Sequence, residues 1–250
     1  MCSSFSQKDL SGRKQYPQFR TTSGLPGSGF TISPLGDPSF YGAIAISIPV
    51  AYSLANGVWV GGVSFAGRDM QLRFPRFDSS ESDFIGNGTG WLMTGFGGKW
   101  GRLTASVMVL SSQFDAAFNA LYTPPGQRGP VTFGVGVQDS LGDGGTSGQA
   151  IDEQGGGNSR SVFATSTWKV RDNVFATAGI GTNRFRFGFG GVSWNMDRSW
   201  SLEAEHDGYN FNGGVAYRMR LGNDAGSGFG SLMLGTIRGK YLFASLSFGF

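Results

Sequence analysis

Short runs in which apolar and polar residues alternate one by one fill most of the chain after about residue 39. Val131–Val137 alternates without a break, and Arg184–Phe189 places three phenylalanines on one face and two arginines on the other. The alternation continues through Trp200–Glu205 and Asn210–Leu221. Successive side chains point to opposite faces of a β-strand, whereas a helix needs apolar residues every three or four positions. The chain is therefore predicted to be all-β.

The composition distinguishes a folded β protein from a disordered glycine-rich chain. Glycine supplies 43 of the 250 residues, but phenylalanine supplies 22, and aromatic residues together make up 14%. Disordered chains are poor in aromatic residues, so a folded structure is expected. The sequence contains no run of ~18 apolar residues, the length that a transmembrane helix needs. A net charge of +3 is too small to indicate nucleic-acid binding.

Twelve strands separated by turn residues are expected. Most have the ~9–11 residues with which a tilted strand crosses a bilayer, and bacterial single-chain barrels have an even number of strands. Pro49 predicts a bulge in the first strand or a shorter strand. Residues 115–122, followed by two prolines, are expected to form one or two turns of helix. The strands are expected over residues 39–52, 57–67, 89–98, 101–112, 129–138, 160–170, 173–182, 184–194, 198–207, 209–221, 229–238 and 240–250.

The last ten residues place Leu242, Ala244, Leu246, Phe248 and Phe250 on one face of the final strand. This pattern resembles the C-terminal insertion signal of bacterial outer-membrane β-barrels. The resemblance implies a transmembrane antiparallel up-and-down β-barrel of about 12 strands in the bacterial outer membrane. Pairing of the last strand with the first would remove the strand edges that hydrocarbon does not tolerate. The alternative fold is a soluble β-sandwich that ends on an amphipathic strand.

Residues 1–38 are polar and rich in Ser, Gly and Pro, and are expected to form a periplasmic tail or leader, with the barrel over residues 39–250. The N-terminus has no apolar core of a signal peptide, which indicates a mature form, a trimmed form or an incomplete gene model. If Phe250 lies at the periplasmic end, the long polar segment 139–159 falls at the outer end, where barrels have their longer loops.

Cys2 is the only cysteine, which excludes an internal disulfide and a cysteine-cluster metal site. Its context, CSSFSQ, resembles the start of a mature bacterial lipoprotein. Lipidation of Cys2 is therefore the alternative to an incidental thiol in the tail.

Charged and amide side chains are expected on the inward faces of neighbouring strands near the C-terminus. Antiparallel neighbours bring such side chains opposite one another, which predicts a ladder of arginine and glutamate across the wall. Two interpretations remain open: the charges pair and plug a narrow lumen, or they line a net-positive track for an anionic polymer or a small solute. The expected ladder consists of Arg184, Arg186, Glu203, Glu205, Asn210, Asn212, Arg218 and Arg220.

The stretch Trp200–Arg218 combines an acidic strand, an Asp-Gly-Tyr turn and the pattern Asn-x-Gly-x-x-Tyr-Arg. It resembles a strand–turn–strand element in outer-membrane proteins of the YjbH exopolysaccharide-biosynthesis type. The resemblance covers about twenty residues, and the family members are considerably longer. It implies a role in making or exporting an extracellular polysaccharide, polysaccharide-export components as partners, and no catalytic residues to carry over.

His206 is the only histidine. A histidine base needs an orienting group and a nucleophile or activated water within hydrogen-bond reach, and no companion motif for either accompanies it. The protein is therefore expected not to be an enzyme, and to use no cofactor and no metal. The leading function is support for the production, export or passage of an extracellular polysaccharide or another polar solute. A closed structural or interaction barrel without transport is the first alternative, and an outer-membrane hydrolase using His206 is the second. The expected partners are outer-membrane lipid and the barrel assembly machinery, and not nucleic acid.

Overall fold

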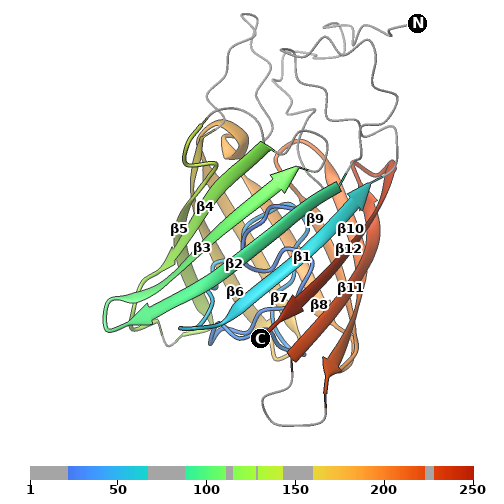
Figure 1. Ribbon diagram of the computed structural model, residues 1–250, viewed down its shortest axis with the longest axis horizontal. Coiled ribbons are helices and arrows are strands. Elements are labelled where there is room, and N and C mark those ends of the chain that lie inside the picture. Colours follow the sequence, from blue (N-terminus) through green and yellow to red (C-terminus); the bar gives the residue numbers. More distant parts are fainter. Residues whose placement is uncertain (1–21, 67–87, 111–114, 128, 143–159, 223–227) are drawn as a thin grey trace, which may run out of the picture.

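The structure is a computed structural model that describes residues 22–66, 88–110, 115–127, 129–142, 160–222 and 228–250. In these residues twelve antiparallel strands form one closed barrel, in which each strand pairs with its neighbours in the sequence (Figure 1). The predicted fold class is confirmed. The strands are β1 (Trp59–Ala66), β2 (Gly88–Gly98), β3 (Gly101–Leu110), β4 (Asp115–Thr123), β5 (Val131–Gln138), β6 (Ser161–Arg171), β7 (Val174–Gly181), β8 (Phe189–Asn195), β9 (Trp200–His206), β10 (Phe211–Leu221), β11 (Gly228–Ile237) and β12 (Tyr241–Gly249).

The barrel closes where β12 pairs with β1, with Val63 opposite Leu246. The seam ends on two further backbone hydrogen bonds, because the N–H of Trp59 donates to the carbonyl of Phe250 (2.9 Å) and the N–H of Phe250 donates to the carbonyl of Trp59 (2.8 Å). Every strand therefore has two hydrogen-bonded neighbours, and the described wall has no free edge.

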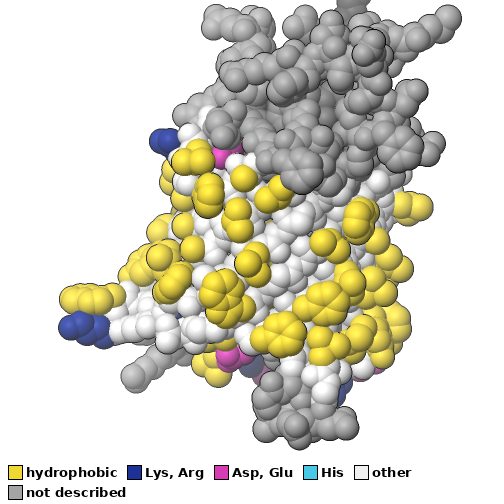
Figure 2. Space-filling model, in the orientation of Figure 1, with side chains coloured by type: hydrophobic (Ala, Val, Ile, Leu, Met, Phe, Trp, Pro, Cys, Tyr) yellow, Lys and Arg dark blue, Asp and Glu magenta, His cyan; other side chains and the backbone are white. Residues whose placement is uncertain are grey.

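The outer surface of the wall is apolar over most of its height (Figure 2). On the face seen there, charged side chains gather near the two ends and at the tip of a protruding hairpin. Outward positions hold large apolar residues such as Phe133, Ile180 and Leu234, each at least half exposed. A closed sheet with an apolar exterior satisfies all its backbone groups in lipid, which is the anatomy of bacterial outer-membrane barrels. The predicted location in the bacterial outer membrane agrees with this anatomy.

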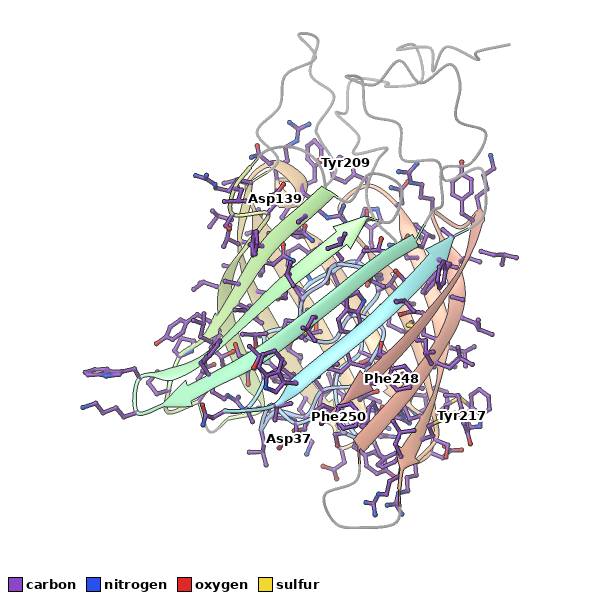
Figure 3. All side chains as sticks on the ribbon, in the orientation of Figure 1. Asp37, Asp139, Tyr209, Tyr217, Phe248 and Phe250 are labelled. Atoms are coloured by element: carbon purple, nitrogen blue, oxygen red, sulfur yellow. The ribbon has the colours of Figure 1, made fainter. Side chains whose placement is uncertain are left out.

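Exposed tryptophans mark one end of the barrel. These side chains lie where β1 and β9 begin and where β6 and β8 end, and in the β2–β3 turn. Phe250 lies at the same end, whereas Tyr209 and Asp139 lie at the opposite end (Figure 3). We call these the carboxyl end and the far end. Tryptophan rings favour the boundary between lipid and water, so the carboxyl end lies at one membrane interface. The exposed tryptophans are Trp59, Trp100, Trp168, Trp194 and Trp200.

Residues 22–58, which we call the lumen segment, run inside the barrel (Figure 1). Leu25, Phe30, Ile32 and Leu54 have no exposed surface, and every residue from 42 to 54 is buried. The strand predicted over 39–52 is therefore wrong. Its alternating alanines and isoleucines face side chains all round rather than lipid on one side, and only isolated bridges form within it.

A second correction concerns residues 115–122, which form β4 instead of a helix. β4 pairs with β3 over nine residue pairs, from Arg102 opposite Thr123 to Leu110 opposite Asp115. The strand count stays at twelve because β4 replaces the strand expected over 39–52. The first wall strand is thus β1, and residues 39–58 belong to the interior rather than to the wall. Residues 1–21, with Cys2, lie outside the described part of the chain.

The exchange of one strand also moves some connections to the other end. The turn at 99–100 lies at the carboxyl end, and the connection 67–87 joins the far ends of β1 and β2. The long segment 139–160 connects β5 and β6 at the far end, opposite Phe250, as expected. Within the described residues, no helix is long and apolar enough to cross a lipid bilayer.

Candidate functional site

The lumen segment folds back on itself without regular secondary structure. Isolated bridges join Ser28 to Ala45, and Ile32 to Pro38 and to Ala43. The backbone N–H of Ser23 donates to the carbonyl of Ile46 at 3.0 Å. These contacts leave many backbone groups of the segment without a partner inside the segment itself. A buried backbone group without a partner is costly, so the wall must supply the remaining partners.

Threonine hydroxyls of the wall supply many of them. Thr104 accepts a hydrogen bond from the N–H of Leu54 (2.7 Å), and Thr167 accepts one from the N–H of Ala51 (2.8 Å). Thr165 donates to the carbonyl of Pro49 (2.9 Å). These threonines come from β3 and β6, so the wall holds the segment from two separate strands.

Glu205 of β9 makes the densest set of contacts with the segment. Its carboxylate accepts hydrogen bonds from the N–H of Ile46 (2.9 Å), the N–H of Ser47 (2.8 Å) and the hydroxyl of Ser47 (2.6 Å). Asn212 of β10, directly opposite Glu205, donates to the same carboxylate at 2.9 Å. Hydrogen bonds to a charged group are shorter and stronger than neutral ones, so Glu205 is the strongest single hold on this part of the segment.

Arg218 of β10 holds the segment nearer the carboxyl end. Its guanidinium donates to the carbonyl of Phe40 and to the side-chain oxygen of Asn195, and also to the carbonyls of Asp197 (2.7 Å) and Trp200 (2.8 Å). The side chain is 1% exposed. Arg218 therefore ties the segment to the β8–β9 turn.

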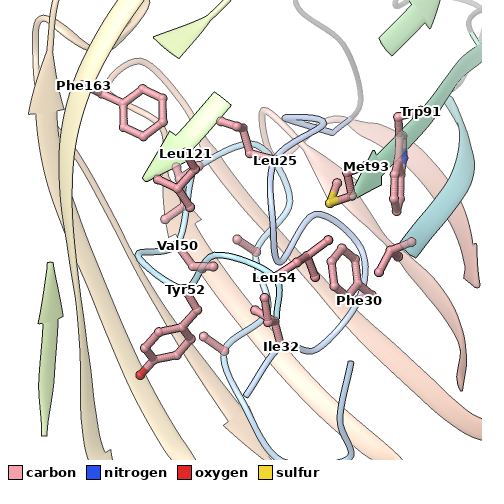
Figure 4. Packing of buried hydrophobic residues seen from close by; sticks show 14 of the residues in the cluster. Leu25, Phe30, Ile32, Val50, Tyr52, Leu54, Trp91, Met93, Leu121 and Phe163 are labelled. Atoms are coloured by element: carbon pink, nitrogen blue, oxygen red, sulfur yellow. The ribbon is translucent and has the colours of Figure 1, made fainter. Parts of the chain in front are cut away.

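Apolar packing fills the space between these polar contacts (Figure 4). The ring of Phe30 stacks on Trp91 with centroids 5.8 Å apart, and Tyr52 meets Phe175 edge-on at 6.4 Å. Leu25 and Val50 join the same buried cluster. Burying a large apolar side chain stabilises a fold by about 1.5–3 kcal/mol. Along the described segment, the lumen is thus occupied by a packed apolar core.

The structure brings part of the predicted ladder together. Glu205, Asn212 and Arg218 all contact the lumen segment, and Arg184 places a guanidinium nitrogen 3.5 Å from the carbonyl of Ser47. Glu203 shares the inward face with Glu205 and is 6% exposed. The ladder does not form one row, because Glu205 and Arg218 lie toward opposite ends of the barrel and bind different parts of the segment.

Arg184, Arg186 and Asn210 lie in connections between strands, and Arg220 lies at the end of β10. The strand expected over 184–194 begins only at Phe189, so Arg184 lies in the 3-10 helix Asn183–Phe185 and Arg186 in the connection to β8. Burial raises the pKa of the nearby Tyr209 hydroxyl, and Arg186 and Arg184 act in the opposite direction. Asn210 belongs to the β9–β10 turn, and Arg220 is exposed near the carboxyl end.

The C-terminal residues of the predicted insertion signal share the outward face of β12. Leu242 and Phe250 are 73% and 74% exposed, and Phe248 is 38% exposed, while Ala244 and Leu246 are partly covered by neighbours. The register of the final strand thus points this face toward lipid.

Sequence reasoning missed the wall threonines and the lumen segment itself. Ser161, Phe163, Thr165 and Thr167 alternate with outward residues on β6, so their inward direction could have been read from the period of two. Their role could not be read, because the partner groups are backbone atoms of a distant segment.

His206 takes part in the β9–β10 turn. Its Nδ1 accepts a hydrogen bond from the N–H of Gly208 at 3.2 Å, and its ring packs edge-on against Phe211 at 4.7 Å. Through these two contacts the imidazole ring stabilises the β9–β10 turn. Among the described residues, no three His, Cys, Asp or Glu side chains gather in a way that could hold a metal ion.

Comparison with known proteins finds similarity among solved structures. No family model matches the sequence, and no curated protein matches it. KdgM porin, alone and in complex with disordered oligogalacturonate, is similar with a TM-score of 0.47 and 8% identity over 77% of this chain and 98% of the porin. Two mutants of the Rh. blastica porin have a TM-score of 0.28 and 12% identity over 78% of this chain and 98% of the porin. The resemblance to YjbH-type proteins stays a sequence-based prediction.

Proposed function

We propose that this protein is an outer-membrane barrel closed by its own lumen segment, which acts as a structural or interaction barrel of the envelope and not as an open diffusion channel. One observation supports this proposal above all others: residues 22–58 are matched to the wall group by group. Glu205 binds the N–H groups of Ile46 and Ser47, and Thr104 binds that of Leu54. A segment that only rested in a pore would not need such individual partners.

The free energies of hydrogen bonding and apolar packing also favour the closed barrel. A net hydrogen bond contributes about 1 kcal/mol, but leaving a buried donor unsatisfied costs about 1–3 kcal/mol. Removing the segment would expose the wall threonines to water and would strip the apolar cluster around Phe30 and Tyr52 of its packing. The closed state is therefore the stable one, and any opening needs an external source of free energy.

Passage of a polar solute, including an extracellular polysaccharide, is the second candidate. The inward wall favours it, because hydroxyl-bearing residues such as Thr89, Ser106, Thr177 and Ser231 would line a hydrated channel if the segment moved out. The YjbH resemblance adds polysaccharide-export components as proposed partners. A genomic neighbourhood of polysaccharide synthesis and export genes would favour this candidate over the first.

The proposal assigns no enzymatic activity. His206 serves the β9–β10 turn, and lipase and peptide-hydrolysis assays on the folded protein should give equal rates for the wild type and His206→Ala. A rate that His206→Ala abolishes would instead establish the hydrolase. The proposed partners are outer-membrane lipid and the barrel assembly machinery.

Single-channel recording in planar bilayers separates the closed barrel from a pore. The folded wild type should give no steady conductance, whereas Glu205→Ala should give openings because the segment loses its strongest hold. Asp172→Ala is the matched control, since it removes a carboxylate from an exposed turn. A shift in gel mobility on heating verifies that each variant is folded. Stable conductance of the folded wild type would refute the closed barrel and establish passage.

A further inference from the structure

A pocket of 310 Å³ opens at the carboxyl end, where the β8–β9 turn meets the end of β10. At roughly 30 Å³ per water molecule, it has room for about ten waters or for one polar headgroup. Its lining is rich in arginine. The lining residues are Phe40, Arg198, Ser199, Tyr217, Arg218, Met219 and Arg220.

An aromatic pair lies beside this pocket. Trp200 of β9 and Tyr217 of β10 lie opposite each other on the outward face, with ring centroids 4.9 Å apart. Tyr217 lies near the carboxyl end of the barrel (Figure 3), in the ring of exposed tryptophans. Aromatic rings with a polar edge favour the headgroup layer, so the pocket opens where lipid headgroups lie.

The guanidinium N–H groups of two of the three arginines are available to a ligand. Arg218 is saturated by carbonyl and amide oxygens. Arg198 is exposed and lies over the ring of Phe40, 5.0 Å from its centroid, which holds the guanidinium beside the pocket. Arg220 is also exposed, and no hydrogen bond or ion pair of its side chain occurs within the described residues.

The neighbouring carboxylate, that of Asp197, is used within the β8–β9 turn. Asp197 accepts hydrogen bonds from the N–H groups of Ser199 (2.6 Å) and Trp200 (2.7 Å) and so forms the turn. One negative charge remains against the three arginines, so the pocket has an excess of positive charge. Guanidinium groups bind phosphate with two parallel hydrogen bonds, which suits them to a phosphate ligand.

We propose that this pocket binds the phosphate of an anionic phospholipid, with Arg198 and Arg220 as its ligands and the Trp200–Tyr217 pair beside its glycerol region. The acyl chains would then lie along the apolar outer face of β9 and β10, over residues such as Leu202. Phe40 belongs to the lumen segment, whereas the other lining residues belong to the β8–β9 turn and the end of β10, so the site requires only that this part of the segment stays in place.

Native mass spectrometry of the folded barrel, titrated with phosphatidylglycerol or phosphatidylcholine, tests the proposal. The wild type should retain phosphatidylglycerol more strongly than phosphatidylcholine. The double variant Arg198→Gln, Arg220→Gln should bind phosphatidylglycerol about thirtyfold more weakly, since each basic residue at a membrane surface contributes about 1 kcal/mol and about 1.4 kcal/mol is a factor of ten. Replacing both by lysine should restore part of the affinity.

Lys169→Gln with Arg171→Gln is the matched control, because it removes two positive charges from the same end of the barrel, away from the pocket. If this control weakens the binding of phosphatidylglycerol equally, the site is overturned, and only a general attraction between positive charges and the anionic lipid remains. Equal retention of both lipids by the wild type would also overturn it. Inorganic phosphate is the third arm: if it binds as tightly as phosphatidylglycerol, the lipid assignment fails.

Discussion

The wall strands and the lumen segment both bury backbone amides, but they find their hydrogen-bond partners differently. Each wall strand pairs with two others, as β10 does with β9 and β11, and the partners are backbone groups of regular ladders. The lumen segment instead uses side chains, such as Glu205 and Thr104, which belong to strands far away in sequence. Both solutions satisfy the same requirement.

The difference lies in how much each structure depends on single side chains. A ladder bond survives most substitutions because it is made by the main chain. A bond between the segment and the wall disappears when its one side chain is replaced, and the buried N–H group then has no partner. Inward polar substitutions should therefore affect stability much more than outward ones.

Glu205→Ala should have the largest effect. It removes the acceptor of Ile46 and Ser47 and should lower the free energy of unfolding by about 3 kcal/mol, because charged acceptors contribute most and their donors stay buried. Urea unfolding in detergent, followed by tryptophan fluorescence, measures the change. Asp172→Ala, in an exposed turn, should leave the free energy of unfolding almost unchanged. Equal effects would show that the segment does not depend on Glu205.

Gly95→Ala should follow. The new Cβ would overlap the backbone carbonyl of Ala55 in the lumen segment, which cannot yield as a flexible side chain would. Overpacking of this kind should cost about 2 kcal/mol in the same unfolding measurement. Gly90→Ala on the same strand is the control, because its Cβ would meet no atom within 4 Å. If both variants unfold alike, the close approach of segment and wall at Gly95 does not exist.

Thr104→Val keeps the size of the side chain and removes the acceptor of the Leu54 N–H. The expected loss is about 1 kcal/mol, the cost of one unmade buried hydrogen bond. Thr94→Val, on the outward face of β2 beside Leu92 and Phe96, should cost nothing or stabilise slightly in lipid. A larger loss at Thr94 than at Thr104 would contradict the contrast between the two faces.

Asp197→Asn should have the smallest effect, because the same kind of bond is here exposed to water. Hydrogen bonds from the N–H groups of Trp200 and Ser199 hold the pKa of Asp197 below its usual value. A lowered folded-state pKa gives stability that is present above the unfolded value of about 3.9 and is lost as the pH falls through the folded one. Between about pH 5 and pH 2, the unfolding temperature of the wild type should therefore fall slightly more than that of Asp197→Asn. Thermal unfolding at a series of pH values measures this difference. Identical pH profiles of the two proteins would show that the hydrogen bonds of Asp197 in the turn do not contribute to stability.

The wall could be predicted from the sequence because its pattern is local. Val131–Gln138 and Tyr241–Gly249 alternate with a period of two. The alternation in β12 alone indicates which of its side chains face outward. Residues 115–122 were misread because Asp115, two alanines and the later prolines favour a helix, although pairing with β3 decides the outcome.

The interior could not be predicted in the same way. Ala43–Ile48 alternates like a lipid-facing strand, yet both of its faces are buried, and only contacts with distant strands distinguish the two cases. The contact between Glu205 and Ser47 spans 158 residues of sequence. No local pattern carries information over that distance.

The pair of hydrogen bonds between Trp59 and Phe250 has a consequence for biogenesis. The lumen segment precedes β1 directly, and the strand that completes the cylinder is the last to be synthesised. We expect the 37-residue segment to be in place when β12 pairs with β1, because a closed wall leaves only its two ends for the entry of the segment. Internal packing should then accompany closure of the barrel, so that substitutions at Glu205 or Gly95 should lower the yield of folded barrel as well as the stability of the mature protein.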